Sequence, residues 1–242
     1  MRGPAISDLF RLMALAAPFF PGVAAALAAG PAGAAPAAPE HIRFVTLVRH
    51  GMYDHVDSLD DRVANGLNAL GREQVRLLGK RLASLPEKPD RFVSSDLLRA
   101  RETAEGLGEA LSMHPDLDTL LAECTPPSSR PGFDAQHDPT EMALCQTNLE
   151  AAWAKYFRPS PERDAHDLLV CHGNVIRWFV SRALGNDVRH WTSLDIANAS
   201  ITVIAVRPDG TTRLVAYSDV GHLPLEKQTW AGRGAGWGSA AK

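Results

Sequence analysis

The stretch VTLVRHG, residues 45–51, decides the fold. An apolar run of strand-forming residues ends abruptly in arginine, histidine and glycine. Such a run predicts a buried strand. Bulky polar residues at its end do not stabilise that strand, so they indicate a functional role. The stretch DLLVCHGN, residues 167–174, repeats the pattern with a second apolar run that ends in histidine and glycine. Two buried strands with polar ends therefore indicate a sheet whose strand ends carry the chemistry.

Helical and strand-like patterns alternate along the chain between and after these stretches. Apolar residues at helical spacing predict helices over residues 70–85, 96–111 and 139–157, and another directly after 173. Asp96 is predicted to cap the second of these helices. A short run at 90–95 predicts a further strand, and two alternating strands around the turn Pro208-Asp209-Gly210 predict a hairpin.

This order of elements predicts an α/β fold. We expect a three-layer α/β/α sandwich with a mostly parallel central sheet and an antiparallel addition at the end of the chain. The segment ECTPPSSRPGFDAQHD, residues 123–138, contains three prolines and has no period, so it is predicted to be a surface loop. Loops of this length often carry function.

The composition limits the classes of partner and cofactor. The chain has 242 residues and a formal net charge of -3, which suits one domain and argues against nucleic acid as a partner. An anionic ligand would need local positive charge. Cys124, Cys145 and Cys171 match no zinc-site spacing and no disulfide framework, so idle thiols are favoured, with one unassigned bridge left open. No metal and no cofactor are expected.

The first 39 residues differ in kind from the rest. Arg2 and Arg11 flank the start of an apolar stretch, and small residues at 32–34 resemble a cleavage site, so we predict a signal peptide followed by an Ala/Pro-rich linker. This predicts an exported protein, periplasmic or secreted. The alternative is an uncleaved N-terminal segment that anchors the protein to a membrane. The catalytic domain is then expected at 40–230, followed by a flexible Gly-rich tail at 231–242.

Polar residues of one chemical theme lie at the predicted strand ends. Arg49 and His50 follow the first strand, Arg99 lies one helical turn beyond the second, and His172 follows the third. Glu123 begins the long loop. Two arginines can neutralise a phosphate dianion through paired hydrogen bonds, and a histidine can attack phosphorus. The set therefore points to a phosphoryl group.

Between residues 45 and 229 the chain resembles the histidine phosphatase superfamily, the phosphoglycerate-mutase-like proteins. Within that superfamily it is most similar to the mitochondrial serine/threonine protein phosphatases. The resemblance is carried by LVRHG, LGREQVRLLGKRLASL, SSDLLRARETAE, CHGNVIRWFVSRAL, SLDIANASITVIAVRPDG and DVGHLP. It implies a phosphoglycerate-mutase-like fold.

The resemblance also implies a role for each candidate residue. His50 matches the nucleophile, Glu123 the proton donor, and Arg49, Arg99 and His172 the groups that bind phosphate, with His172 also counted as catalytic. The start of the helix at Gly173 is expected to add backbone N–H groups to the same anion. Nearby positive charge should lower the pKa of His50, which must be neutral to attack phosphorus.

The sequence departs from the family pattern in two places. After RHG, the segment MYDHVDS lacks the Glu or Gln and the later Asn or Thr of many members, so a smaller phosphate shell is expected. The segment ECTPPSSRPGF lacks the features of true mutases, which favours hydrolysis. We therefore expect a metal-independent phosphomonoester hydrolase acting through phosphohistidine, on phosphoserine and phosphothreonine proteins.

Two other functions stay open at this point. One is a phosphatase of small molecules or sugar phosphates, and the other is a non-catalytic phosphate-binding module. A homodimer is compatible with the family, but no surface pattern in the sequence identifies one.

Overall fold

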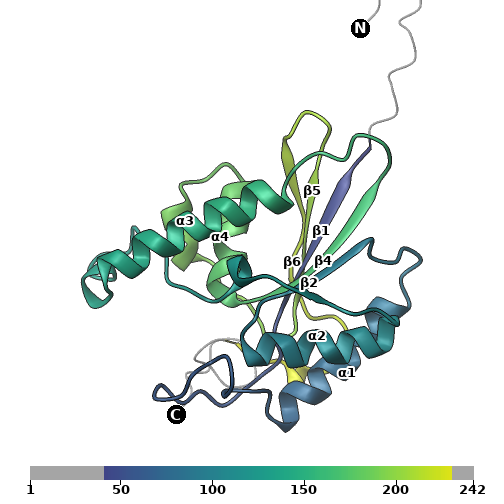
Figure 1. Ribbon diagram of the computed structural model, residues 1–242, viewed down its shortest axis with the longest axis horizontal. Helices are drawn as coiled ribbons and strands as arrows, with labels where there is room; N and C mark the ends of the chain where they lie inside the picture. Colours follow the sequence, from purple (N-terminus) through teal and green to yellow (C-terminus); the bar gives the residue numbers. More distant parts are fainter. Residues whose placement is uncertain (1–40, 231–242) are drawn as a thin grey trace, which may run out of the picture. The chain divides into compact units, whose positions relative to one another are not determined.

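The computed structural model of the protein describes residues 41–230, which form a mixed sheet between helices (Figure 1). The strands follow the order β3-β2-β4-β1-β5-β6 across the sheet. Strands β3, β2, β4 and β1 are mutually parallel, whereas β5 pairs antiparallel with β1 and forms a hairpin with β6. Their bounds are β1 (Arg43–Arg49), β2 (Arg91–Ser94), β3 (Asp116–Leu117), β4 (Ala165–Cys171), β5 (Ile201–Val206) and β6 (Thr212–Asp219).

Helices cover both faces of this sheet. The helices α1 (Ala69–Ala83) and α2 (Leu98–Leu111) lie on one face, and α3 (Pro139–Tyr156) and α4 (Gly173–Ala183) lie on the other (Figure 1). Four short 3-10 helices complete the described elements: η1 (Thr119–Leu121), η2 (Asp134–Gln136), η3 (Val188–Ser193) and η4 (Leu225–Lys227). The predicted three-layer α/β/α sandwich with a mostly parallel sheet is confirmed.

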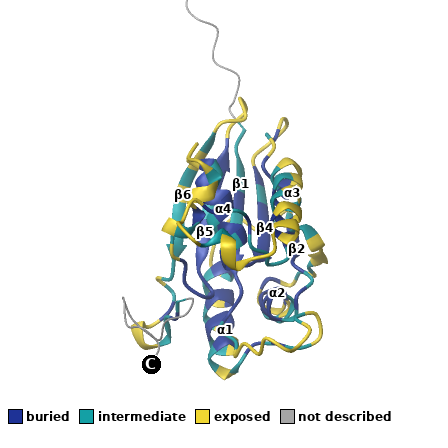
Figure 2. Cartoon of the chain, turned by 90° about the vertical axis from the view of Figure 1, so that its left-hand side faces the viewer, coloured by how far each residue is buried: buried dark blue, intermediate teal, exposed yellow. Residues whose placement is uncertain are grey.

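The alternation of side chains along β1 explains the two cores. Val45 and Leu47 point into the cluster that contains Leu149 of α3 and Phe179 of α4. Val48 points the other way, into the cluster of α1 and α2. Successive side chains of a strand face opposite sides of its sheet, so a nearly continuous apolar run belongs to a strand that is covered on both faces. Figure 2 shows the buried residues along the strands and the inner faces of the helices.

Two local predictions were wrong. Asp96 does not cap α2: its carboxylate accepts a hydrogen bond from Arg62 Nε at 2.8 Å, and the first helical N–H, that of Leu98, is bound by the carbonyl oxygen of Asp61 at 2.8 Å. A backbone carbonyl from a distant loop therefore replaces the side-chain cap. The first helix, predicted over 70–85, ends at Ala83, and Leu85 lies beyond it and is exposed.

The sheet brings three polar strand ends to one edge. β4 lies between β1 and β2 and is parallel to both, with Arg49 opposite Cys171 and Ser94 opposite Val170. The residues that follow these strands therefore emerge side by side, as the carboxyl ends of parallel strands do.

Within residues 41–230, no helix combines the length and the apolar character needed to cross a bilayer. The predicted signal or anchor segment at 1–39 and the predicted tail at 231–242 lie outside the described residues. The domain boundaries stay predictions.

Candidate active site

His50 lies directly after β1 and is 1% exposed. Its Nδ1 is 2.8 Å from the carbonyl oxygen of Gly51. A carbonyl oxygen only accepts, so Nδ1 carries the hydrogen, and Nε2 of the neutral ring keeps its lone pair. Burial, together with the charges of Arg49 and Arg99, holds the pKa of His50 well below the usual histidine value. The ring is therefore neutral and nucleophilic at Nε2.

His172 is the second histidine of the site and is fully buried. The centroid of its ring is 5.1 Å from that of His50, and its Nε2 lies 2.8 Å from Ser95 Oγ. Ser95 Oγ accepts a hydrogen bond from the N–H of Leu97 at 3.3 Å, so its own hydrogen can point to His172 Nε2. The hydrogen of His172 is then on Nδ1, a buried atom with no hydrogen-bond partner among residues 41–230. Burial first, then the charges of its neighbours, lowers the pKa of His172.

Two buried arginines stand beside the histidines. Arg49 is 6% exposed and donates from Nη1 to the carbonyl oxygen of Ile196 at 2.7 Å, and Arg99 is 2% exposed. The Nε of each guanidinium is buried and makes no hydrogen bond within the described part of the chain. Desolvation lowers the pKa of Arg49 to about 10, so it stays charged at neutral pH. The pair therefore presents positive charge with donors to spare.

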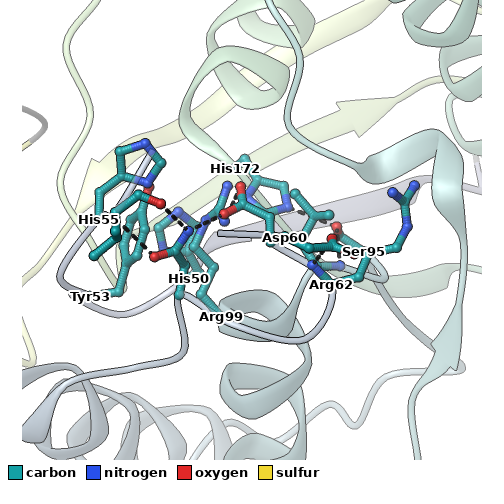
Figure 3. Close-up of polar contacts among 12 residues, drawn as sticks. His50, Tyr53, His55, Asp60, Arg62, Ser95, Arg99 and His172 are labelled. Atoms are coloured by element: carbon teal, nitrogen blue, oxygen red, sulfur yellow. Dashed lines mark hydrogen bonds and ion pairs between the residues drawn. The ribbon is translucent and has the colours of Figure 1, made fainter. Parts of the chain in front are cut away.

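A carboxylate from the loop after β1 contacts one of these arginines. Asp61 Oδ2 lies 2.7 Å from Arg99 Nη1. The guanidinium of Arg99 also lies over the ring of Tyr53, 4.7 Å from its centroid, and Tyr53 stands edge-on to His50. Figure 3 shows His50, Arg99 and His172 together, with Tyr53 on one side. Asp61 therefore binds one N–H donor of Arg99 that an anionic ligand could otherwise use.

Glu123 lies at the start of the long loop and is only partly exposed. Its Oε1 accepts a hydrogen bond from the backbone N–H of Asn174 at 3.2 Å, in the first turn of α4. Burial raises the pKa of Glu123, although Arg49, Arg99 and Arg177 oppose the rise. The hydrogen bond from Asn174, two residues after His172, places the carboxyl group at the same end of β4 as the histidines. A carboxyl group with a raised pKa is suited to carry a proton.

Cys124 and Cys145 form a disulfide, with Cα atoms 5.6 Å apart. The expectation of idle thiols is therefore wrong for these two cysteines, whereas Cys171 is a buried free thiol. Sequence could not pair them, because 21 positions separate them and the loop between them has no periodic structure. A cleft of about 540 Å³ runs beside the disulfide and is lined by Glu123, His137 and Glu141, among others.

The glycine of RHG is needed for close packing. A Cβ atom on Gly51 would lie 2.7 Å from the carbonyl oxygen of Gly71 in α1, well inside contact distance. The backbone after His50 thus rests directly on the start of a helix, which helps to fix the histidine.

The structure brings together Arg49, His50, Arg99 and His172, and the charges of the two arginines reach Glu123. Gly173 begins α4, but the backbone N–H of the next residue already binds Glu123. Sequence reasoning missed Ser95, Tyr53 and Asp61. Ser95 had a signal, since it is the polar last residue of the strand predicted at 90–95. Tyr53 and Asp61 had none, because their positions depend on the path of an irregular loop.

The chain matches known proteins over most of its length. The sequence profile of the histidine phosphatase superfamily (branch 1) matches residues 45–127 and 133–220. The mitochondrial serine/threonine-protein phosphatase PGAM5 of Xenopus laevis is 35% identical over 196 residues, covering 78% of this chain and 70% of that protein. The corresponding protein of Drosophila persimilis is 33% identical over 198 residues, covering 79% and 68%.

Solved structures share the fold. The crystal structure of phosphoglycerate mutase from Plasmodium falciparum superposes with a TM-score of 0.54 at 26% identity, covering 77% of this chain and 96% of that one.

The relatives overturn the expected location. Both phosphatases above are named as mitochondrial proteins, which contradicts an exported protein, periplasmic or secreted. The expectation relied on two arginines, an apolar stretch and small residues. Those features do not define secretion, because transit peptides also have arginine-rich, acid-poor starts.

A profile match over more than half of the chain, relatives at about one-third identity and the shared fold lead to one conclusion. The chain belongs to the histidine phosphatase superfamily and is an enzyme that hydrolyses phosphomonoesters.

Proposed function

We propose that the enzyme dephosphorylates phosphoserine and phosphothreonine residues of proteins, with His50 as the nucleophile and Glu123 as the proton donor. One observation carries the catalytic part. The hydrogen bond from His50 Nδ1 to the Gly51 carbonyl leaves the lone pair on Nε2, inside a cluster of two arginines and a second histidine. Such a group attacks phosphorus without first losing a proton.

The first step transfers the phosphoryl group to the enzyme. The lone pair of His50 Nε2 forms the N–P bond while the bond from phosphorus to the ester oxygen breaks. Glu123 gives its proton to that oxygen, which leaves as the serine or threonine hydroxyl. The guanidinium groups of Arg49 and Arg99 and the Nδ1–H of His172 hold the phosphoryl oxygens as their charge redistributes.

The second step restores the enzyme. The carboxylate of Glu123 takes a proton from a water molecule whose oxygen attacks phosphorus. The N–P bond breaks, inorganic phosphate forms, and His50 returns to its neutral state. Positive charge from the arginines supports both steps, and the proposal includes no metal ion and no cofactor.

The substrate class has two supports. The relatives from Xenopus laevis and Drosophila persimilis are named serine/threonine-protein phosphatases. The cleft that begins at Glu123 extends along the loop to His137 and Glu141, which gives a peptide chain room beside the leaving group. A pocket that only holds a small ester would not require this extension.

The test uses the full-length chain with a chelator present. Phosphate release from phosphoserine and phosphothreonine peptides is compared with release from a panel of small phosphomonoesters. His50→Ala should abolish turnover, and His114→Ala, at an exposed histidine after α2, should retain it. Brief reaction with labelled phosphopeptide should leave an acid-labile, base-stable phosphoryl group on the wild type and on His114→Ala, but not on His50→Ala.

Each outcome decides between functions. Peptide turnover that vanishes in His50→Ala supports the proposal. Release from small esters only would indicate a small-molecule phosphatase, and tight peptide binding without release would indicate a binding module. Substantial turnover by His50→Ala would overturn the nucleophile assignment.

A further inference from the structure

The disulfide between Cys124 and Cys145 begins one residue after Glu123. Cys145 lies in α3, is 2% exposed and packs in the core between the sheet and that helix. The backbone that carries the carboxyl group of Glu123 is therefore tied covalently to a rigid element. This tie has no part in the chemical steps described above.

Two further attachments of Glu123 and Cys124 are polar and come from Asn174 of α4. Asn174 donates from its backbone N–H to Glu123 Oε1 at 3.2 Å and from Nδ2 to the carbonyl oxygen of Cys124 at 2.9 Å. After Cys124 the chain has no helix or strand until η2. Buried Leu121, before Glu123, and a hydrogen bond from Trp191 Nε1 to the carbonyl oxygen of Pro127, after it, also hold this segment. Without the disulfide, its attachments would all be non-covalent.

We propose that the Cys124–Cys145 disulfide is a positioning element for catalysis, which holds Glu123 where it can protonate the leaving oxygen. This inference rests on the proposed role of Glu123. Two anchors on different helices fix the position of a carboxyl group better than one, and a proton donor needs hydrogen-bond reach to the leaving atom.

The leaving group provides a readout that a purely structural disulfide would not move. A serine or threonine alkoxide is a poor leaving group, so its departure depends on protonation. The p-nitrophenolate ion leaves without it. Loss of the disulfide should therefore lower kcat/KM for a phosphoserine peptide far more than kcat/KM for p-nitrophenyl phosphate.

The experiment compares the full-length wild type, Cys124→Ala, the double variant Cys124→Ala/Cys145→Ala, and Glu123→Gln. We expect the ratio of kcat/KM for peptide to kcat/KM for p-nitrophenyl phosphate to fall at least tenfold in all three variants. Wild type is also treated with a dithiol, which is oxidised to its cyclic disulfide while Cys124 and Cys145 become thiols. The ratio should fall on reduction and recover on reoxidation, and the same treatment should leave the double variant unchanged.

The single variant and the reversible reduction keep the test valid if the double variant does not fold, because Cys145 then stays in the core. If Glu123→Gln had the same ratio of the two kcat/KM values as the wild type, the role of Glu123 as the proton donor would be refuted. A lowered ratio in Glu123→Gln with an unchanged ratio in folded Cys124→Ala and in the reduced wild type would refute the positioning role alone. An equal loss on both substrates would assign the disulfide to stability.

Discussion

The two ends of the same three parallel strands carry opposite arrangements of charge. At the amino ends of β1, β2 and β4, Asp167 is 2% exposed and lies between two arginines. Arg43 Nη1 is 2.8 Å from Asp167 Oδ2, and Arg91 Nη2 is 2.6 Å from the same atom. At the carboxyl ends, Arg49 and Arg99 stand beside two neutral histidines and keep buried Nε atoms without partners among residues 41–230.

The difference separates a structural cluster from a functional one. A buried charge is costly unless it is paired, so a cluster that only supports the fold has its partners within the chain. The amino-end cluster meets that condition. The carboxyl-end cluster leaves donors unpaired where a phosphate dianion could bind them. Each kind of cluster should respond differently to mutation.

The largest effect is expected from a substitution in the carboxyl-end cluster. Arg99→Met keeps the length of the side chain but removes its charge and donors. We expect kcat/KM on a phosphoserine peptide to fall about 10²–10³-fold, because phosphoryl charge loses one of its two guanidinium partners. The free energy of unfolding by urea should change little, because removing a desolvated cation offsets the loss of its ion pair with partly exposed Asp61. A marked loss of stability would make Arg99 structural.

The second prediction concerns a substitution in the amino-end cluster. Asp167→Asn should lower the free energy of unfolding by about 2 kcal/mol, because it leaves two partly buried arginines without a counter-charge. Below the melting temperature, kcat/KM should stay at the wild-type value. Asp187→Asn, which removes a surface ion pair with Arg189, is the matched control and should not change stability measurably. If Asp167→Asn lowered kcat/KM without lowering the free energy of unfolding, the two clusters would be coupled.

The third prediction concerns pH. Because the pKa of His50 is lowered, its ring should stay neutral as the pH falls through about 6.5, the usual histidine pKa, and it should gain a proton only at lower pH. NMR of labelled histidine in the free enzyme measures this directly. Glu123 has a raised pKa, so it keeps its proton to higher pH than an ordinary glutamate and loses its acid function as the pH rises further. Peptide kcat/KM should then fall about tenfold per pH unit on the alkaline side.

Glu123→Gln provides the control for that limb. Glutamine does not titrate, so the alkaline fall should disappear in this variant. A fall that persists would belong to another group, and protonation of His50 at or above pH 6.5 would contradict its altered environment.

The smallest expected effect sharpens the comparison. Asp61 pairs with Arg99 of the carboxyl-end cluster. Its contacts with Asn65 and Arg99 hold the pKa of Asp61 below its usual value despite partial burial. Asp61→Asn should free Arg99 and tighten inhibition by inorganic phosphate by roughly threefold to tenfold. The inhibition constant at fixed pH measures this. Weaker inhibition would show that Asp61 orients Arg99 more than it competes with phosphate.

Much of the fold could be predicted from the sequence because its signals are local. Buried parallel strands are apolar on both faces. Helices such as α2 have one apolar face, which in α2 includes Ala100, Ala104 and Leu107. These patterns gave the layers and the order of the elements. The two-residue strand β3 has exposed side chains and therefore no apolar signal, so it was not predicted.

The site was predictable where it depends on strand ends. His50 and His172 follow apolar runs, and the parallel order of the strands brings them together. The contacts of Asp61 and the pairing of Cys124 with Cys145 depend on the paths of loops, which no short-range pattern specifies. The location was misjudged for a different reason, because composition alone does not distinguish one targeting segment from another.

The loop at residues 54–66 has a consequence for how such an enzyme could diversify. It is fastened to α2 through Asp61, whose carbonyl oxygen binds the Leu98 N–H, and through Arg62, which binds Asp96. The phosphate-facing histidines, by contrast, are carried by the sheet edge. A replacement loop that kept the contacts of Asp61 and Arg62 would change the residues that line the substrate site without disturbing the sheet. New specificities could therefore arise, or be grafted, one loop at a time.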